Sequence, residues 1–130
     1  LIDSLVEEGL RYEAPVQTLP RQTTCEVTLA GTTIPAGSMV LPLFGSANRD
    51  ETKYPDPDRF DVLRDMQGHL GFSLGIHYCL GAPLARLEAK IALEALISRL
   101  HNLRRTQDPA IRGEWVMLRG FKTLPLAFDA

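Results

Sequence analysis

The residues best suited to chemistry lie in one ten-residue segment, Phe72–Gly81, with the sequence FSLGIHYCLG. A cysteine, Cys79, follows a histidine, His77, by two residues, and glycines 75 and 81 enclose the pair. An apolar helical pattern begins directly afterwards, and the N–H groups and dipole at a helix N-terminus favour a thiolate over a thiol. Because a thiolate is both a nucleophile and a metal ligand, the segment predicts a reactive or metal-binding site at a helix start.

A single thiolate in such a loop can be the axial ligand of a haem iron, where it favours O–O cleavage. Gly75 and Gly81 leave room for a flat ligand or allow a positive φ. Phe72 can shield the sulfur from water, and His77 can donate a hydrogen bond to an anionic group at the ligand edge. A lone cysteine near a helix start is more often a small buried hydrophobe. The spacing alone leaves both interpretations open.

The composition describes one globular domain of 130 residues, with 45% hydrophobic and 23% charged residues. The net charge of −2 argues against nucleic acid and against an anionic membrane surface as partners. No apolar run approaches the ~20 residues that cross a bilayer. The chain starts without a methionine or a signal-peptide pattern, so we expect these residues to come from the middle of a longer protein. The low number of cysteines favours a reducing compartment, so we expect a cytoplasmic location.

The sequence contains two cysteines, Cys25 and Cys79. Two are too few for a disulfide framework, and their surroundings differ, so we do not expect them to pair. A structural zinc site needs four ligands, and two cysteines with three scattered histidines support one poorly.

Hydrophobic periodicity and turn residues predict the elements that position this segment. We expect helices over 2–12, 44–49 and 80–100, an extended segment over 16–19, strands over 27–29, 32–34 and 39–41, and β-like segments over 115–118 and 124–128. Leu84, Leu87 and Ile91, with Leu80 and Leu96, form an apolar stripe on the long helix. Residues 50–78 include two closely spaced prolines that oppose helix, and an irregular stretch of this length is usually functional.

The segment Phe72–Gly81 resembles the haem-binding signature of the cytochrome P450 superfamily, F-x-x-G-x-H-x-C-x-G, and Ala82–Glu88 is similar to its bacterial, soluble branch. Further motifs of the family follow in order along essentially the whole chain. They are Glu8–Arg11 (E-x-x-R), Asn48–Asp50 with Pro57–Phe60 (the meander), and Arg119–Gly120 with Leu124–Pro125 (the C-terminal hairpin).

The resemblance implies a mainly α fold, multihelical with small antiparallel sheets. Residues 1–130 would be the C-terminal portion of a single domain of this kind. That portion would comprise the Glu-x-x-Arg helix, a β-hairpin, the meander, the cysteine loop, a long helix and a C-terminal hairpin.

The resemblance also assigns roles to individual residues. Cys79 would be the proximal ligand of haem b, with Phe72, Gly75 and Gly81 around it. His77 and Arg21 would pair with the haem propionates, since an arginine fork suits a carboxylate.

Glu8, Arg11 and Arg59 would form a buried ion cluster. Glu8 and Arg11 lie three apart on a predicted helix and can meet there. From the residues alone, a solvated surface pair is the favoured interpretation of this spacing.

Two segments align with parts of the family that face the substrate: Val16, Gln17, Thr18 and Leu19, and Val116 with Met117. Ordinary strand packing is the alternative for both. His69 would lie near a propionate by the same resemblance, but a histidine on a surface loop is the favoured interpretation. Ser73 replaces a glycine that is usual in the signature, and at a positive φ it would add strain of about 1 kcal/mol.

The implied activity is haem-thiolate monooxygenation of a small organic substrate with molecular oxygen. A ferredoxin or flavodoxin-like electron donor would dock near Cys79, steered by Arg86 and Lys90. The helix that activates oxygen has no counterpart here, so we expect no catalytic residue in this portion and no activity from it alone. The alternatives are a truncated, non-catalytic remnant that acts as a haem-binding or interaction module, and an isolated thiol enzyme using Cys79 and His77.

Overall fold

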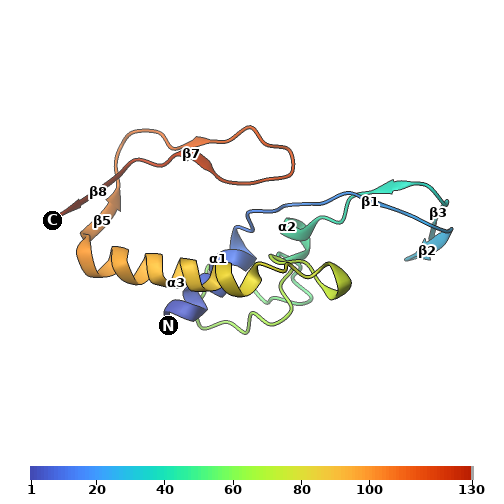
Figure 1. Ribbon diagram of the computed structural model, residues 1–130, viewed down its shortest axis with the longest axis horizontal. Helices are drawn as coiled ribbons and strands as arrows, with labels where there is room; N and C mark the ends of the chain where they lie inside the picture. Colours follow the sequence, from blue (N-terminus) through green and yellow to red (C-terminus); the bar gives the residue numbers. More distant parts are fainter. Residues whose placement is uncertain (130) are drawn as a thin grey trace.

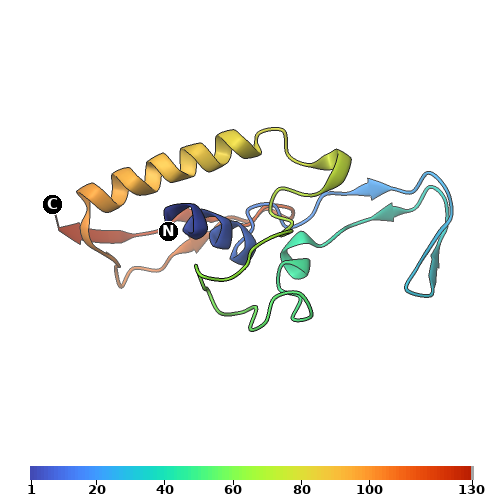
Figure 2. The ribbon, with the colours of Figure 1, turned by 90° about the horizontal axis from the view of Figure 1, so that it is seen from below.

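The structure is a computed structural model that describes residues 1–129; residue 130 lies outside it. Two long helices, α1 (Ile2–Tyr12) and α3 (Ala82–Arg99), pack against each other in the centre of an elongated molecule (Figures 1 and 2). A one-turn helix α2 (Phe44–Ala47) and a 3₁₀ turn η1 (Gly75–His77) lie beside them. None of these helices is long and apolar enough, within residues 1–129, to cross a membrane.

The strands form four separate antiparallel pairs. They are β1 (Arg21–Gln22) with β4 (Met39–Val40), β2 (Val27–Leu29) with β3 (Thr32–Ile34), β5 (His101–Arg105) with β8 (Leu126–Asp129), and β6 (Ile111–Arg112) with β7 (Phe121–Thr123). The described segment is 28% helix and 22% strand, so the expectation of a mainly α fold is not confirmed for this part of the chain.

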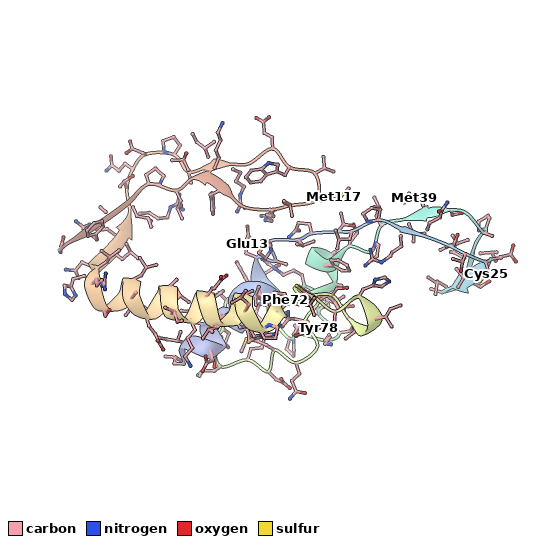
Figure 3. The ribbon with its side chains drawn as sticks, in the orientation of Figure 1. Glu13, Cys25, Met39, Phe72, Tyr78 and Met117 are labelled. Carbon is pink, nitrogen blue, oxygen red and sulfur yellow. The ribbon has the colours of Figure 1, made fainter. Side chains whose placement is uncertain are left out.

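The predicted hairpin over 27–29 and 32–34 is confirmed, with Val27 opposite Ile34. Its two turn residues, Ala30 and Gly31, both have positive φ, at 46° and 79°, as a two-residue hairpin turn with the twist of its strands requires. The hairpin and the β1–β4 pair form an arm that extends from one end of the molecule (Figure 1). Cys25 lies exposed near the tip of this arm (Figure 3).

The long helix starts at Ala82, two residues later than expected, because Leu80 and Gly81 form the turn that leads into it. Pro83 stands in its first turn, where no backbone donor is lost. The predicted apolar stripe is not buried: Leu84, Leu87 and Ile91 are each more than half exposed. The apolar residues of α3 are distributed around the whole helix, and α1 covers only one side of it.

The C-terminal part differs most from expectation. The β-like pattern over 115–118 is a loop rather than a strand, and the strands lie on either side of it as β6 and β7. β5 was not predicted, because all five of its residues are exposed and the polar sequence HNLRR has no apolar alternation. The loop matters for the site, because Leu118 forms an isolated β-bridge with Val16 near the end of α1.

Candidate functional site: a cysteine loop above an apolar recess

The cysteine loop is closed on itself by backbone hydrogen bonds. The N–H of Cys79 donates to the carbonyl of Phe72 (2.9 Å), which joins the two ends of the predicted signature. Inside the loop the N–H of Tyr78 donates to the carbonyl of Gly75 (3.0 Å), and the N–H of Ala82 donates to the carbonyl of Cys79 (3.2 Å) at the helix start. These bonds fix the backbone of Cys79 between the loop and α3.

The two glycines of the loop have different uses. Gly75 has a φ of +62°, which other residues adopt only with strain. Gly81 has a negative φ, so its backbone does not require glycine. A methyl group on Gly81 would lie 3.9 Å from the sulfur of Cys79, so the hydrogen there leaves the surroundings of the sulfur open.

Ser73 has a φ of +62°, the condition under which we expect strain. We predict that Ser73→Gly raises the free energy of unfolding by up to about 1 kcal/mol, because relief of the left-handed strain exceeds the entropy that glycine adds to the unfolded chain. Urea unfolding measures this difference. Ser98→Gly, inside α3, is the control with the opposite sign. A destabilised Ser73→Gly variant would contradict the prediction.

Cys79 lines a recess of about 340 Å³ with mostly apolar walls. The walls come from α1, the following extended segment, α2 and the cysteine loop; they include Leu10, Val16, Leu19, Phe44, Phe72 and His77. Beside the recess, Ile76 and Leu80 are almost fully exposed. The arrangement suits a flat, apolar ligand held by one sulfur.

The four candidates at 16–19 separate into two groups. Val16 and Leu19 line the recess together with Cys79. The amide of Gln17 turns away to donate to the carbonyl of Ala14 (2.5 Å), and Thr18 is buried without lining the recess.

The second predicted segment lies directly beside the first. The N–H of Gln17 donates to the carbonyl of Met117 (2.9 Å), and Met117 is close to the end of α1 in Figure 3. The side chain of Val116 is 92% exposed, and neither it nor that of Met117 reaches the recess. The structure therefore brings the two segments together through their backbones.

The two residues expected to meet propionates are His77 and Arg21. His77 lies on the rim of the recess, and its side chain is exposed. Arg21 is half-buried in β1 and donates to the carbonyl of Pro20 (3.0 Å); within residues 1–129 it forms no ion pair. Within the described residues, neither side chain forms an ion pair, so both can bind an anionic group.

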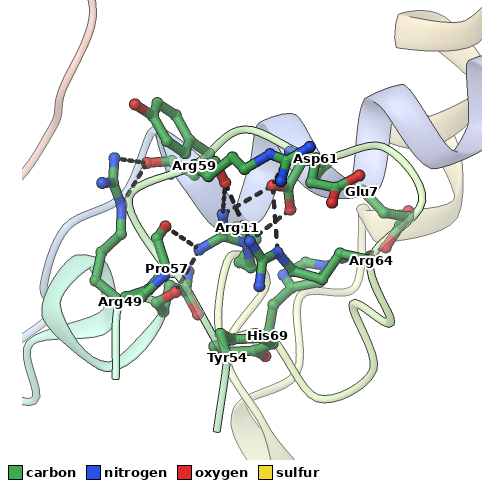
Figure 4. Close-up of polar contacts among 12 residues, drawn as sticks. Glu7, Arg11, Arg49, Tyr54, Pro57, Arg59, Asp61, Arg64 and His69 are labelled. Carbon is green, nitrogen blue, oxygen red and sulfur yellow. Dashed lines mark hydrogen bonds and ion pairs between the residues drawn. The ribbon is translucent and has the colours of Figure 1, made fainter. Parts of the chain in front are cut away.

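Glu8 and Arg11 form a buried ion cluster where α1 meets the meander (Figure 4). The guanidinium of Arg11 donates two bonds to the carboxylate of Glu8 (2.6 and 2.8 Å), and both side chains are fully buried. Arg11 also donates to the carbonyls of Asn48 (2.8 Å) and Pro57 (3.0 Å), and the N–H of Asp61 donates to Glu8 (2.8 Å). This pair is a central tie between α1 and the meander, not a solvated surface contact.

The third arginine of the cluster is Arg64, and the assignment of Arg59 to this role is wrong. The Nε of Arg64 lies 3.7 Å from the carboxylate of Glu8, and its side chain is 9% exposed. Arg59 is exposed and contributes its backbone carbonyl, which accepts from Arg11 (3.4 Å) and Arg64 (3.2 Å). Arg59 therefore turns its carbonyl, rather than its side chain, toward the guanidinium groups of Arg11 and Arg64.

A pair of variants tests this correction. Arg64→Gln should lower the free energy of unfolding by about 1–3 kcal/mol, because it removes a positive charge beside the buried carboxylate of Glu8 and weakens the bonds that Arg64 donates to the carbonyls of Asp56 and Arg59. Arg59→Gln should change it by less than about 0.5 kcal/mol, because the backbone carbonyl remains. Urea midpoints of both variants measure the difference, and equal losses would restore Arg59 to the cluster.

The pKa of Glu8 reflects a balance of opposing effects. Burial alone would raise this pKa, but the hydrogen bonds from Arg11 and the Asp61 N–H outweigh it, so the pKa lies below its ordinary 4.5. The bonds to Glu8 raise the pKa of Arg11 and so favour its charged form. Both groups are therefore ionised at neutral pH.

The two residues expected to steer an electron donor, Arg86 and Lys90, already have partners. Arg86 forms a two-bond ion pair with Glu7 and also donates to the hydroxyl of Tyr78. Lys90 pairs with Asp3 at 3.0 Å. Both pairs join α3 to α1, so neither charge is free for the role we expected.

Sequence reasoning missed three contributors to the site region: Asn48, Arg64 and Glu7. Asn48 is fully buried, and its side-chain oxygen accepts from the N–H of Leu70 (2.6 Å), which links α2 to the segment before the cysteine loop. Glu7 has the same side chain as its neighbour Glu8, but it is partly exposed and binds other partners. No periodic pattern marks these positions, although Asn48 lies in a motif that we quoted for the meander.

Comparison with known proteins now identifies the family. The sequence model described as Cytochrome P450 matches residues 1–125. The chain is 49% identical to the cytochrome P450 monooxygenase PikC of Streptomyces venezuelae, over 97% of this chain and 31% of PikC. It is 45% identical to 6-deoxyerythronolide B hydroxylase of Saccharopolyspora erythraea, over 98% of this chain and 32% of that enzyme.

The solved structure of cytochrome P450 CYP109Q5 from Chondromyces apiculatus is 51% identical and superposes with a TM-score of 0.94, over 98% of this chain and 33% of that one. The chain therefore has the fold of this class and belongs to the cytochrome P450 superfamily, in its bacterial type. Proteins of this family bind haem b. The chain spans about a third of the length of the relatives that it matches.

Proposed function

We propose that this chain supplies the cysteine-bearing half of the haem site of a P450 monooxygenase, as the C-terminal portion of a single P450 domain. The observation that carries the proposal is the position of Cys79, whose backbone is fixed by the closed loop while its side chain lines an apolar recess. Cys79, as thiolate, is the proposed ligand of the iron of haem b.

The residues around Cys79 fit such a group. One soft sulfur ligand, apolar walls and a glycine beside the sulfur suit a flat macrocycle with a single protein ligand on this side. His77 and Arg21 would bind its carboxylates, and Phe72 would cover the sulfur. Residues 1–129 contain no group of three acidic, cysteine or histidine side chains arranged to hold a metal ion, so Cys79 would be a single protein ligand.

When bound, a haem with a thiolate ligand activates dioxygen, so that one oxygen atom enters an organic substrate. The contribution of this chain is to hold the ligand and to exclude water around it. The fixed loop keeps Cys79 in place, and Phe72, Leu10 and Phe44 provide an apolar environment that limits hydration of the sulfur. Val16 and Leu19 would contact the substrate or the ring edge.

The names of the relatives support oxygen insertion, since they include a monooxygenase and a hydroxylase. A ferredoxin or flavodoxin-like protein would supply the electrons. Because Arg86 and Lys90 are neutralised by acidic partners of α1, the proposal assigns them no part in binding this donor.

The test is a carbon monoxide difference spectrum of the reduced protein after haem addition. A red-shifted Soret band of the thiolate type is the expected result, and its absence from a folded, haem-loaded protein would overturn the proposal. Substrate turnover with an electron donor then separates a monooxygenase from a module that only binds haem. A module that only binds haem or a partner is the second candidate function. The exposed apolar side chains of α3 favour it, because they offer an extended surface for association.

A further inference from the structure

A second polar network lies behind the cysteine loop, on the side away from the recess. Its centre is the carboxylate of Glu7 on α1. One oxygen accepts from the Nε of Arg86 (2.5 Å); the other accepts from the Nη2 of Arg86 (3.0 Å) and from the Nε2 of His69 (2.9 Å). One carboxylate therefore joins α1 to α3 and to the segment before the cysteine loop.

The hydrogen bonds of His69 define its tautomer. Its Nδ1 accepts from the N–H of Gly71 (3.1 Å), so the proton of the neutral ring is on Nε2, which donates to Glu7. The side chain of His69 is 5% exposed. A buried ring thus transmits the position of Glu7 to the backbone one residue before Phe72.

Arg86 reaches the loop at two further points. The carbon of its guanidinium lies 4.7 Å from the centre of the Phe72 ring, a cation–π contact. Its Nη1 donates to the hydroxyl of Tyr78 (2.8 Å), the residue directly before Cys79. Figure 3 shows Phe72 and Tyr78 together near the start of α3. Arg86 thereby contacts residues near both ends of the closed loop.

The charges of the network favour this geometry. The hydrogen bonds from Arg86 lower the pKa of Glu7, against the effect of burial, and those from Glu7 raise the pKa of Arg86. The carboxylate is therefore ionised at neutral pH and holds its donors by charge-assisted bonds. Because Glu7 and Arg86 are about one-third exposed, their pair alone adds little to global stability.

We propose that Glu7 is a positioning residue for the cysteine loop: through His69 and Arg86 it fixes Phe72 and Tyr78, and through them the backbone of Cys79. The loop then has two supports, one from its own backbone bonds and one from α1. That Cys79 binds the haem iron is part of the proposed function. The positioning role of Glu7 rests on the proposed function only where it concerns the effect of Glu7 on haem ligation.

The molecule contains a matched control for this network. Lys90 and Asp3 form an ion pair between the same two helices, about one turn further along, at 3.0 Å. This pair contacts no residue of the cysteine loop. Removing the Lys90–Asp3 pair therefore measures how much a simple ion pair between α1 and α3 contributes to the protection of Cys79.

The first test measures alkylation of Cys79 in the haem-free full chain, in a Cys25→Ser background so that one thiol remains. We expect Glu7→Gln and Arg86→Lys each to raise the alkylation rate by roughly fivefold, which corresponds to about 1 kcal/mol of loop-opening free energy. Lys90→Gln should react like the parent. Arg86→Lys retains the charge at that position and removes the planar fork, which guards against a variant that fails to fold.

The proposal is overturned if Glu7→Gln and Arg86→Lys react at the parent rate, or if Lys90→Gln accelerates alkylation equally. The second readout is the share of thiolate-type carbon monoxide band in the haem-loaded variants, which should fall in Glu7→Gln and Arg86→Lys and not in Lys90→Gln. If the parent shows no such band, the proposed function fails while the alkylation rates still decide the role of Glu7.

Discussion

Replacing Cys79 with serine should abolish the thiolate-type carbon monoxide band of the haem-loaded protein. Serine keeps the size and the backbone bonds of the loop, so the change removes the sulfur without removing the support around it. A hydroxyl at this position does not ionise at neutral pH and is a poor ligand for haem iron, whereas a thiolate is a strong one.

The matched control is Cys25→Ser. Cys25 is exposed near the tip of the β1–β4 arm, far from the recess-lining Phe72 in Figure 3, so this variant should retain the full band. A band that persists in Cys79→Ser, or disappears in Cys25→Ser, would exclude Cys79 as the ligand. Far-ultraviolet circular dichroism of both variants checks that the helices are intact.

Replacing Glu8 with glutamine should lower the free energy of unfolding by about 3–5 kcal/mol, because it leaves the charge of Arg11 buried without a counter-ion. This is a large part of the stability of a typical domain. Urea unfolding at neutral pH measures the loss. Glu88→Gln, on the exposed face of α3, is the control and should change the free energy by less than about 0.5 kcal/mol.

The same pair has a defined pH dependence. The pKa of Glu8 is lower in the folded protein than its ordinary 4.5, so its stabilising effect is complete above that value. The effect is lost as the pH falls below 4.5 toward the folded pKa, where the carboxylate becomes protonated. The stability of Glu8→Gln should therefore vary less with pH in this range than that of the parent, and parallel pH profiles would contradict the assigned charge pair.

The parts of the fold that could be predicted are those with local signals. The spacing of Glu8 and Arg11 places both on one side of a helix, and Ala30–Gly31 between two β-branched runs specifies a hairpin turn. The cysteine segment is also local, since its closing bond joins residues only seven apart.

The parts that could not be predicted depend on distant contacts. Arg59 and Arg64 both lie in an irregular segment without periodicity, so composition cannot tell which side chain turns inward and which offers its carbonyl. Glu7 and His69 meet 62 residues apart, and neither position has a distinctive neighbourhood in the sequence. The exposed apolar stripe of α3 shows the same limit, because a helical pattern indicates a surface to be covered without indicating what covers it.

The bonds between the end of α1 and residues 117–119 affect the order in which this region folds during synthesis. Glu13 accepts from Arg119 (2.6 Å), 106 residues later in the chain, next to the backbone bond between Gln17 and Met117. The ribosome releases α1 and the cysteine loop well before residue 119, so this side of the region stays open during synthesis. Contacts of such long range also form slowly. We therefore expect the C-terminal loop to close last, leaving an interval in which a large, flat molecule can enter from that direction.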